Sequence, residues 1–248
     1  MELDPYPHRN IYHESQGRNL LNPENYPEEV KAYLQKEKQI LSQLKPHFKV
    51  LVEVGCFDGT YLQFCHRHRK KYIGIDINLE YLEEGKHKAD FFNTPTQEYE
   101  FHNLNAQNLH EIKSASQLFQ STPKEEILVM FPFNCLGNIP NVQSVIDSLN
   151  TLGLAYFISN FNTTNEATKV REQYYGNCDY DTIIKRVDND GVRFTSIDGL
   201  NSVAYDLNFL ITKFIHTNTN TQMIHINGIG IGLLNLNRYF NATNLITT

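Results

Sequence analysis

Short apolar segments and amphipathic segments alternate along residues 28–159. Apolar residues recur at helical spacing over residues 28–44, and Pro46 ends this predicted helix. After it, runs with the length of buried strands are separated by stretches with helical periodicity. The predicted strands cover residues 49–54, 72–77, 99–104, 127–131 and 154–159, and the predicted helices between them cover about 60–69, 78–86, 107–119 and 142–149.

The alternation of strands and helices predicts right-handed crossovers and a doubly wound parallel sheet. The last third of the chain differs, because residues 182–195 predict a hairpin and residues 202–215 predict a helix. Asn227-Gly228 lies between two apolar runs and suits a type I′ turn, so it predicts a second hairpin. The expected fold class is therefore α/β: a doubly wound, seven-stranded, mostly parallel sheet with a C-terminal antiparallel hairpin.

The length of 248 residues suits one α/β domain with an accessory segment. Residues 1–27 are rich in Tyr, His, Asn and Pro and have no clear periodicity, so they predict an N-terminal arm or lid. Residues 28–248 are expected to form the main domain.

Charge and cysteine usage narrow the classes of partner. The net charge of −6 disfavours a duplex nucleic-acid partner, although a local basic patch stays possible. The four cysteines are scattered without metal-ligand spacing, which argues against a metal site or a disulfide framework and for a reducing compartment. No run is apolar enough to span a bilayer, and the N-terminus lacks the features of a signal peptide. We therefore expect a cytoplasmic protein without a membrane partner.

The segment V-L-V-E-V-G-C-F-D-G-T-Y, residues 50–61, predicts a strand ending near Glu53, then a glycine turn, then a helix start. Gly55 and Gly59 can take backbone angles closed to other residues and let a ligand approach the main chain. A dinucleotide site requires a third glycine at position 57, where this chain has Phe57. Taken alone, the segment leaves a nucleotide-binding turn and an ordinary buried turn equally open.

Asp76 ends the second predicted strand, where a carboxylate can accept hydrogen bonds from both hydroxyls of a ribose. The alternative is that Asp76 caps the helix that follows, with Asn78 as the expected N-cap. Asn105, in F-H-N-L-N-A-Q-N-L, likewise either faces a ligand or caps the next helix.

These segments together resemble class I S-adenosylmethionine (SAM) methyltransferases. Glu53, Gly55 and Gly59 resemble the first motif of that family, with Phe57 in place of its middle glycine. Residues 101–109 resemble the adenine-facing segment, and F-P-F-N-C-L-G-N-I-P-N, residues 131–141, resembles the family's post-strand motif F-N-x-L-x-H-L. The C-terminal hairpin is similar to the antiparallel end of the family's sheet.

The resemblance implies transfer of a methyl group from SAM to an oxygen, nitrogen or carbon nucleophile. It implies a small-molecule acceptor, with a protein acceptor as an open alternative. Met130 replaces the polar residue of the motif used on amino-nucleobases, which disfavours such a substrate. The cofactor contacts that the resemblance implies are Glu53, Gly55, Cys56, Phe57, Gly59, Asp76, Ile77, Asn105, Ala106, Phe133 and Asn134.

Two tyrosine-rich segments are expected to cover the substrate: the arm and an insert at residues 160–196. Aromatic walls suit a sulfonium and an aromatic acceptor, although the same tyrosines can simply pack the arm onto the domain. His13, beside Glu14, is the candidate general base. The predicted substrate contacts are Tyr12, Tyr26, Asn134, Tyr174 and Tyr175.

Two other functions stay open on the same fold. The departures at Phe57 and Asn105 are compatible with a non-catalytic SAM-binding or interaction module. A nicotinamide-dependent oxidoreductase is disfavoured by Phe57 and by the terminal hairpin. If SAM binds, the ring of Phe57 should pack beside its methionine end without filling that space.

Overall fold

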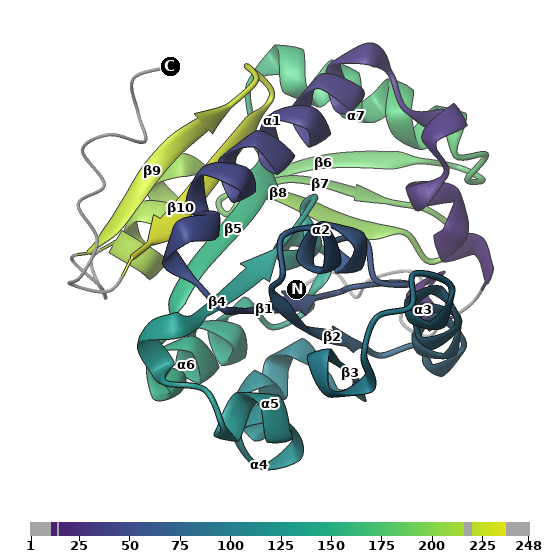
Figure 1. Cartoon of the computed structure of the whole chain (residues 1–248). Helices are drawn as coiled ribbons and strands as arrows, with labels where there is room; N and C mark the ends of the chain where they lie inside the picture. Colours follow the sequence, from purple (N-terminus) through teal and green to yellow (C-terminus); the bar gives the residue numbers. More distant parts are fainter. Residues whose placement is uncertain (1–10, 14, 216–219, 237–248) are drawn as a thin grey trace.

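A seven-stranded sheet forms the centre of the computed structural model, which describes residues 11–13, 15–215 and 220–236 (Figure 1). The strand order is β3-β2-β1-β4-β5-β10-β9. Strand β10 pairs antiparallel with β5 and β9, and all other neighbours in this sheet are parallel. This confirms the predicted fold class. The strands are β1 (Val50–Val54), β2 (Lys71–Asp76), β3 (Tyr99–Asn103), β4 (Ile127–Phe131), β5 (Ala155–Phe161), β9 (Thr221–Ile226) and β10 (Gly230–Asn235).

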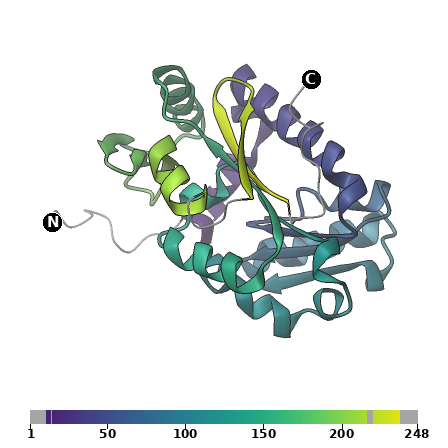
Figure 2. The ribbon, with the colours of Figure 1, turned by 90° about the vertical axis from the view of Figure 1, so that its left-hand side faces the viewer.

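Helices cover both faces of this sheet, because the side chains along each buried strand alternate between the faces. Leu51 and Leu128 belong to the core on the side of α1, whereas Val52 and Val129 belong to the core on the side of α6. Figure 2 shows these two helices on opposite sides of the sheet. The first face carries α1 (Glu28–Leu44), α2 (Leu62–Arg67), α3 (Leu79–Phe91) and α7 (Asn165–Asn177), and the second carries α4 (Ile112–Ala115), α5 (Gln117–Gln120), α6 (Val142–Leu152) and α8 (Leu207–Leu210).

The predicted ends of the first helices are largely confirmed. Helix α1 covers the predicted range, and Pro46 follows it in the short 3₁₀ helix η4 (Lys45–His47). Asn78 caps α3, since its side-chain oxygen accepts from the backbone N–H of Glu80 at 2.9 Å. The helix continues to Phe91 instead of ending near residue 86, because no proline or glycine follows Gly85 before Pro95.

The single helix predicted over residues 107–119 is wrong. The chain forms η6 (Ala106–Glu111), then α4 and α5, with an extended Ser116 between the last two. The hydroxyl of Ser116 accepts from the N–H of Phe119 at 3.0 Å, so this serine starts a new helix instead of continuing the previous one.

The helix predicted over residues 202–215 is also wrong in its first part. Residues Asn201–Tyr205 form strand β8, which pairs with β7 (Gly191–Thr195) of the predicted hairpin β6–β7, where β6 is Ile184–Asp188. Pairing with a neighbouring strand overrides the helical periodicity here. Asp206 then caps the short helix α8, and a turn of π-helix (Ile211–Ile215) follows.

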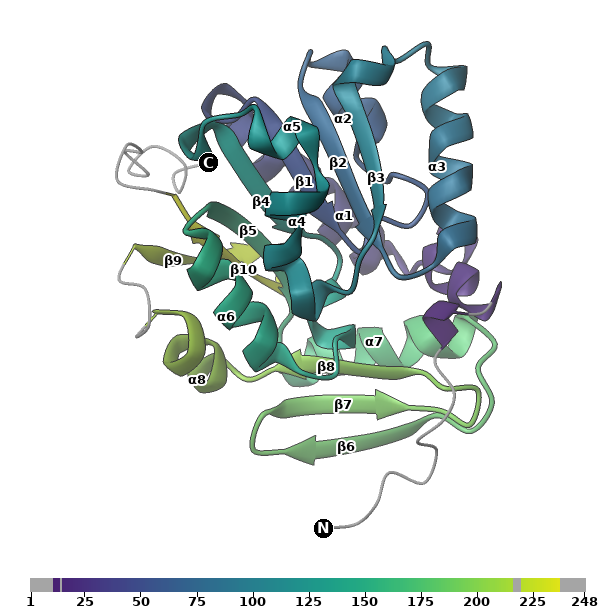
Figure 3. The same ribbon diagram turned by 90° about the horizontal axis from the view of Figure 1, so that it is seen from below.

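The insert therefore contains helix α7, which the sequence pattern does not predict, and contributes to a second, three-stranded sheet β6-β7-β8. Figure 3 shows this sheet beside α7, with the arm near one end of it. The described part of the arm forms three 3₁₀ helices: η1 (Ile11–His13), η2 (Ser15–Leu21) and η3 (Pro23–Asn25).

The arm is attached to α3 on one side and to the end of α7 on the other. Arg18 pairs with Glu84 of α3 through two hydrogen bonds of 2.5 and 2.9 Å. The side-chain amide of Asn19 donates to the carbonyl of Cys178 at 3.0 Å, and that of Asn177 donates to the carbonyl of Asn25 at the same distance. The arm thus bridges two elements that are far apart in the sequence. Across the described residues, we find no helix that combines the length and apolarity required to cross a membrane.

Candidate functional site

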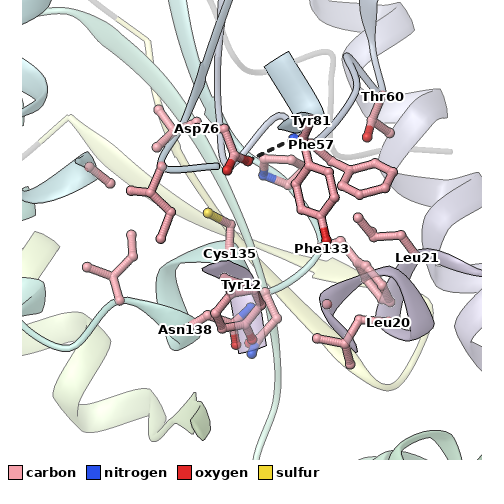
Figure 4. A pocket seen from close by; sticks show the side chains of 18 of the residues that line it. Tyr12, Leu20, Leu21, Phe57, Thr60, Asp76, Tyr81, Phe133, Cys135 and Asn138 are labelled. Atoms are coloured by element: carbon pink, nitrogen blue, oxygen red, sulfur yellow. Dashed lines mark hydrogen bonds between the residues drawn. The ribbon is translucent and has the colours of Figure 1, made fainter. Parts of the chain in front are cut away.

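A cavity of about 520 Å³ lies at the carboxyl ends of β1, β2 and β4, where arm residues such as Leu20 and Leu21 contribute to its wall (Figure 4). This volume is in the range of small-molecule sites. The position between β1 and β4 is the point at which the strand order reverses, where α/β sheets bind ligands.

The loop after β1 shapes one end of the cavity. Gly55 has a φ of +69°, and a Cβ atom at this position would lie 2.5 Å from the sulfur of Cys135. The backbone N–H groups of Gly55 and Cys56 both donate to the carbonyl of Ile75, at 2.8 and 3.0 Å. The N–H of Phe57 donates to the Asp76 carboxylate at 2.9 Å. Because these N–H groups are already bonded, the loop does not offer them to a pyrophosphate.

Asp76 faces the cavity with a carboxylate that the backbone holds in place. Its Oδ2 accepts from the N–H of Phe57, the bond dashed in Figure 4, and its Oδ1 accepts from the N–H of Asn78 at 2.9 Å. Each carboxylate oxygen can accept a further hydrogen bond. Asp76 therefore presents two adjacent carboxylate oxygens in the cavity wall.

Phe57 and Tyr81 form a second part of this end. Their ring centroids are 4.2 Å apart, and the guanidinium of Arg18 lies 4.9 Å from the Tyr81 centroid and 5.8 Å from that of Phe57. Burial raises the pKa of Tyr81 to about 12. The Phe57 ring packs against Tyr81, and the cavity remains open beside it.

Asn105 and Ala106 line the same end of the cavity, as do Ile77 and Leu104. The side-chain oxygen of Asn105 accepts from the N–H of Gln107 at 2.9 Å, which confirms the capping role considered for it. A capping oxygen keeps one acceptor position, so this role and a position in the cavity wall are compatible.

Glu37 of α1 is a cavity residue that the sequence motifs missed. Its carboxylate is fully buried, accepts from the hydroxyl of Tyr61, and accepts from the N–H of Phe133 at 2.8 Å. Burial raises the pKa of Glu37. The sequence signal was a charged residue within the apolar stripe of α1, four positions after Tyr33 and four before Leu41.

Aromatic rings make up much of the other end. Phe133 lies 5.6 Å from Tyr26 and from Tyr174, and 5.8 Å from Phe161, between ring centroids. All five predicted substrate contacts line the cavity: Tyr12, Tyr26, Asn134, Tyr174 and Tyr175.

Asn134 uses its side-chain amide to connect neighbouring elements. It has a left-handed backbone with φ of 59°, and its Oδ1 accepts from the N–H of Phe161 at 3.1 Å. Its Nδ2 donates to the hydroxyl of Ser202 and to the carbonyl of Val203, both at 3.1 Å. Asn134 therefore attaches β8 to the end of β5 while it forms part of the cavity wall.

Three predicted cofactor contacts do not line the cavity: Glu53, Cys56 and Gly59. The buried carboxylate of Glu53 accepts from the N–H of Tyr61 at 3.0 Å and from the hydroxyl of Tyr72 at 2.6 Å. Burial raises its pKa to about 8. Through these contacts Glu53 stabilises the loop after β1 from the side that faces away from the cavity.

His13 lies in η1, but its side chain falls outside the described residues, so its role as a base stays a prediction. No group of three or more His, Cys, Asp or Glu side chains in the described part of the chain is arranged to hold a metal ion.

The fold defined by this sheet and cavity recurs in solved structures. A putative methyltransferase from Thermobifida fusca has a TM-score of 0.58 at 10% identity, and the similarity covers 91% of this chain and 94% of that one. Magnesium protoporphyrin IX methyltransferase from Synechocystis PCC 6803, with bound S-adenosylhomocysteine (SAH), has a TM-score of 0.54 at 11% identity, covering 91% and 95%. 1,6-Didemethyltoxoflavin-N1-methyltransferase from Burkholderia thailandensis, with bound 1,6-didemethyltoxoflavin and SAH, has a TM-score of 0.53 at 11% identity, covering 90% and 82%.

The chain thus has the fold of class I SAM-dependent methyltransferases, at low sequence identity to its structural neighbours. No protein-family model and no curated protein matches the sequence.

Proposed function

We propose that the protein is a SAM-dependent methyltransferase that acts on a small molecule. The observation that carries this proposal is the cavity itself. It lies at the point where the strand order reverses, has a fixed carboxylate, Asp76, at one end and has aromatic rings at the other. The arm contributes part of the wall, so the cavity suits an acceptor that is small enough to be enclosed.

The residues present fit the chemistry of SAM. Asp76 would accept from the ribose hydroxyls, and Asn105 and Ala106 would border the adenine. The buried carboxylate of Glu37 would suit the ammonium group of the methionine end. The rings around Phe133 would face the sulfonium, a cation that aromatic faces attract.

Bound SAM would supply an electrophilic methyl group. The protein would then hold the acceptor in line with that methyl group and exclude water. Such alignment can provide much of the rate enhancement. The bridge from α3 to α7 through the arm would keep the two ends of the cavity at a constant separation. A general base is required only for an acceptor that carries a proton at the working pH.

Titration calorimetry with SAH tests the proposal. Wild-type protein should bind SAH, and Asp76→Ala should weaken binding by about tenfold or more, since two charge-assisted hydrogen bonds are lost. Asp147→Ala, which removes an exposed carboxylate on α6, is the matched control and should bind as wild type does. Absence of SAH binding by wild type would refute the proposal.

A second candidate is a SAM-binding protein without catalysis. The specific observation in its favour is Phe57, a bulky residue with φ of 53° where the related motif has glycine. Incubation of the protein with methyl-labelled SAM and cell extract separates the two candidates. Transfer of label to any extract component excludes the second one.

A further inference from the structure

A chain of hydrogen-bond donors runs from a buried arginine to the cavity. Arg171 of α7 is fully buried, and its guanidinium donates to the carbonyls of Val192 and Ser202 at 2.9 and 3.0 Å and to the hydroxyl of Tyr175 at 3.5 Å. Among the described residues, no carboxylate forms an ion pair with it, and its Nε has no hydrogen-bond partner. Arginine stays protonated in proteins, so a buried positive charge lies directly behind Tyr175.

The hydroxyl of Ser202 accepts hydrogen bonds from two neighbours, so its own hydrogen is left to donate. The hydroxyl of Tyr175 donates to the Ser202 oxygen at 2.8 Å, and the amide of Asn134 donates to the same oxygen at 3.1 Å. A hydroxyl oxygen has two lone pairs and one hydrogen, so Ser202 accepts twice and is left as a donor. Within the described part of the chain, the hydrogen bonds of the Ser202 hydroxyl are the two that it accepts, from Tyr175 and Asn134. Ser202, Tyr175 and Asn134 all line the cavity.

From this polarity we infer that the acceptor molecule presents an anionic oxygen, of a carboxylate or an ionised hydroxyl, to the Ser202 hydroxyl. Each donor in a chain is polarised by the one behind it, and the chain here begins at the cation of Arg171. A charge-assisted hydrogen bond at its end is stronger than a neutral one. The assignment of this site to the acceptor rests on the proposed function.

The neighbouring walls indicate the rest of the acceptor. Tyr26, Phe133 and Tyr174 form an aromatic cluster in the same cavity, and Phe161 packs on it from β5. Such rings favour a flat apolar body. The substrate class is therefore an aryl or similarly flat compound that carries an oxygen anion.

The test compares aryl carboxylates with their uncharged carboxamides. Benzoate and naphthoate, and benzamide and naphthamide, are titrated into full-length protein, first without SAH and then with saturating SAH, and binding is followed by ligand-observed NMR. Wild type should prefer each carboxylate by roughly tenfold, the expected effect of one hydrogen bond to a charged group. Ser202→Ala and Tyr175→Phe should abolish the preference.

Two matched variants separate this effect from general destabilisation. Ser196→Ala removes another buried serine hydroxyl of the region around the second sheet, and Tyr156→Phe removes a buried tyrosine hydroxyl that bonds Thr221. Neither residue lines the cavity, so both variants should keep the preference for carboxylates. Loss of the preference in these controls as well would overturn the inference.

The outcomes distinguish the inference from the proposed function. If SAH binds but carboxylates and carboxamides bind equally, or neither binds, the acceptor is not recognised as an anion and the inference is wrong while the proposed function stands. If SAH displaces benzoate, the donor chain holds the carboxylate of the cofactor product, which also overturns the inference. If carboxylates are preferred but SAH does not bind, the anion site stands and the methyltransferase proposal fails.

Discussion

Replacement of Glu53 by glutamine gives the sharpest test of how the motif acid of β1 acts. The Glu53 carboxylate is fully buried, and only its Oε2 is bonded, to Tyr61 and Tyr72; its Oε1 has no hydrogen-bond partner among the described residues. Glutamine has the same shape and can accept both bonds through its oxygen. The substitution therefore removes the ionisation and keeps the contacts.

The magnitude follows from the pKa of Glu53, which burial raises from the usual value of 4.5 to about 8. Below pH 4.5 the group is protonated in both the folded and the unfolded state and costs nothing. Between pH 4.5 and pH 8 the unfolded state ionises first, so the free energy of unfolding falls as the pH rises. At about 1.4 kcal/mol for each pH unit, the full loss is on the order of 5 kcal/mol.

The assay is urea denaturation of wild type and Glu53→Gln at several pH values from 4.5 to 8.5. The variant should gain stability relative to wild type across this window by several kcal/mol, with most of the gain before pH 8. Glu111→Gln, at an exposed position, is the matched control and should follow wild type. Parallel pH curves for wild type and Glu53→Gln would show that burial does not raise the pKa of Glu53. A large loss of SAH affinity in the variant would place Glu53 in contact with the ligand instead of behind the loop.

Two further predictions concern the loop and the arm. In thermal melts, Gly55→Ala should lower the free energy of unfolding by about 2 kcal/mol or more, because the new Cβ would lie 2.5 Å from the Cys135 sulfur. The substitution should also weaken SAH binding. Gly153→Ala is the control: its φ is 62° and its surroundings are open, so it measures the cost of the backbone strain alone. Arg18→Ala should change stability by less than about 1 kcal/mol, since its bond to Glu84 is partly exposed. It should speed SAH dissociation in stopped-flow measurements, and an unchanged rate would show that this ion pair does not hold the arm closed.

The elements that were predicted correctly depend on local patterns. Strand β4 has five apolar residues and β1 has four beside Glu53, and all ten residues are buried, a pattern typical of central parallel strands covered on both faces. The C-terminal hairpin was legible because Asn227 and Gly228 both take the positive φ that a type I′ turn requires, at 47° and 69°. In each case the residue types determine the conformation without help from distant parts of the chain.

The elements that were missed depend on distant contacts. Residues 202–205 have a pattern that a helix can also satisfy, and only the partner strand β7 decides in favour of β8. Ser116 breaks a helix by a side-chain bond that many mid-helix serines do not form. Glu37 lies in the cavity wall because α1 packs beside the loop that contains Phe133, nearly a hundred residues away, whose N–H donates to it.

Asp76, at the end of β2, bonds directly to the glycine turn after β1 through the backbone of Phe57. Its carboxylate accepts the N–H of Phe57 and so stabilises the left-handed backbone of that residue, which a bulky side chain adopts only at a cost. In this chain the Asp76 side chain therefore stabilises a backbone conformation that a glycine at position 57 would adopt without such a contact. It follows that Asp76→Ala acts on the ligand and on the loop at once, and that Asp76→Ala/Phe57→Gly separates the two effects. If Asp76→Ala weakens SAH binding only because the backbone at position 57 loses its left-handed conformation, glycine at that position should restore binding. If the weaker binding comes from the lost contact to the ribose, the double variant should bind as weakly as Asp76→Ala.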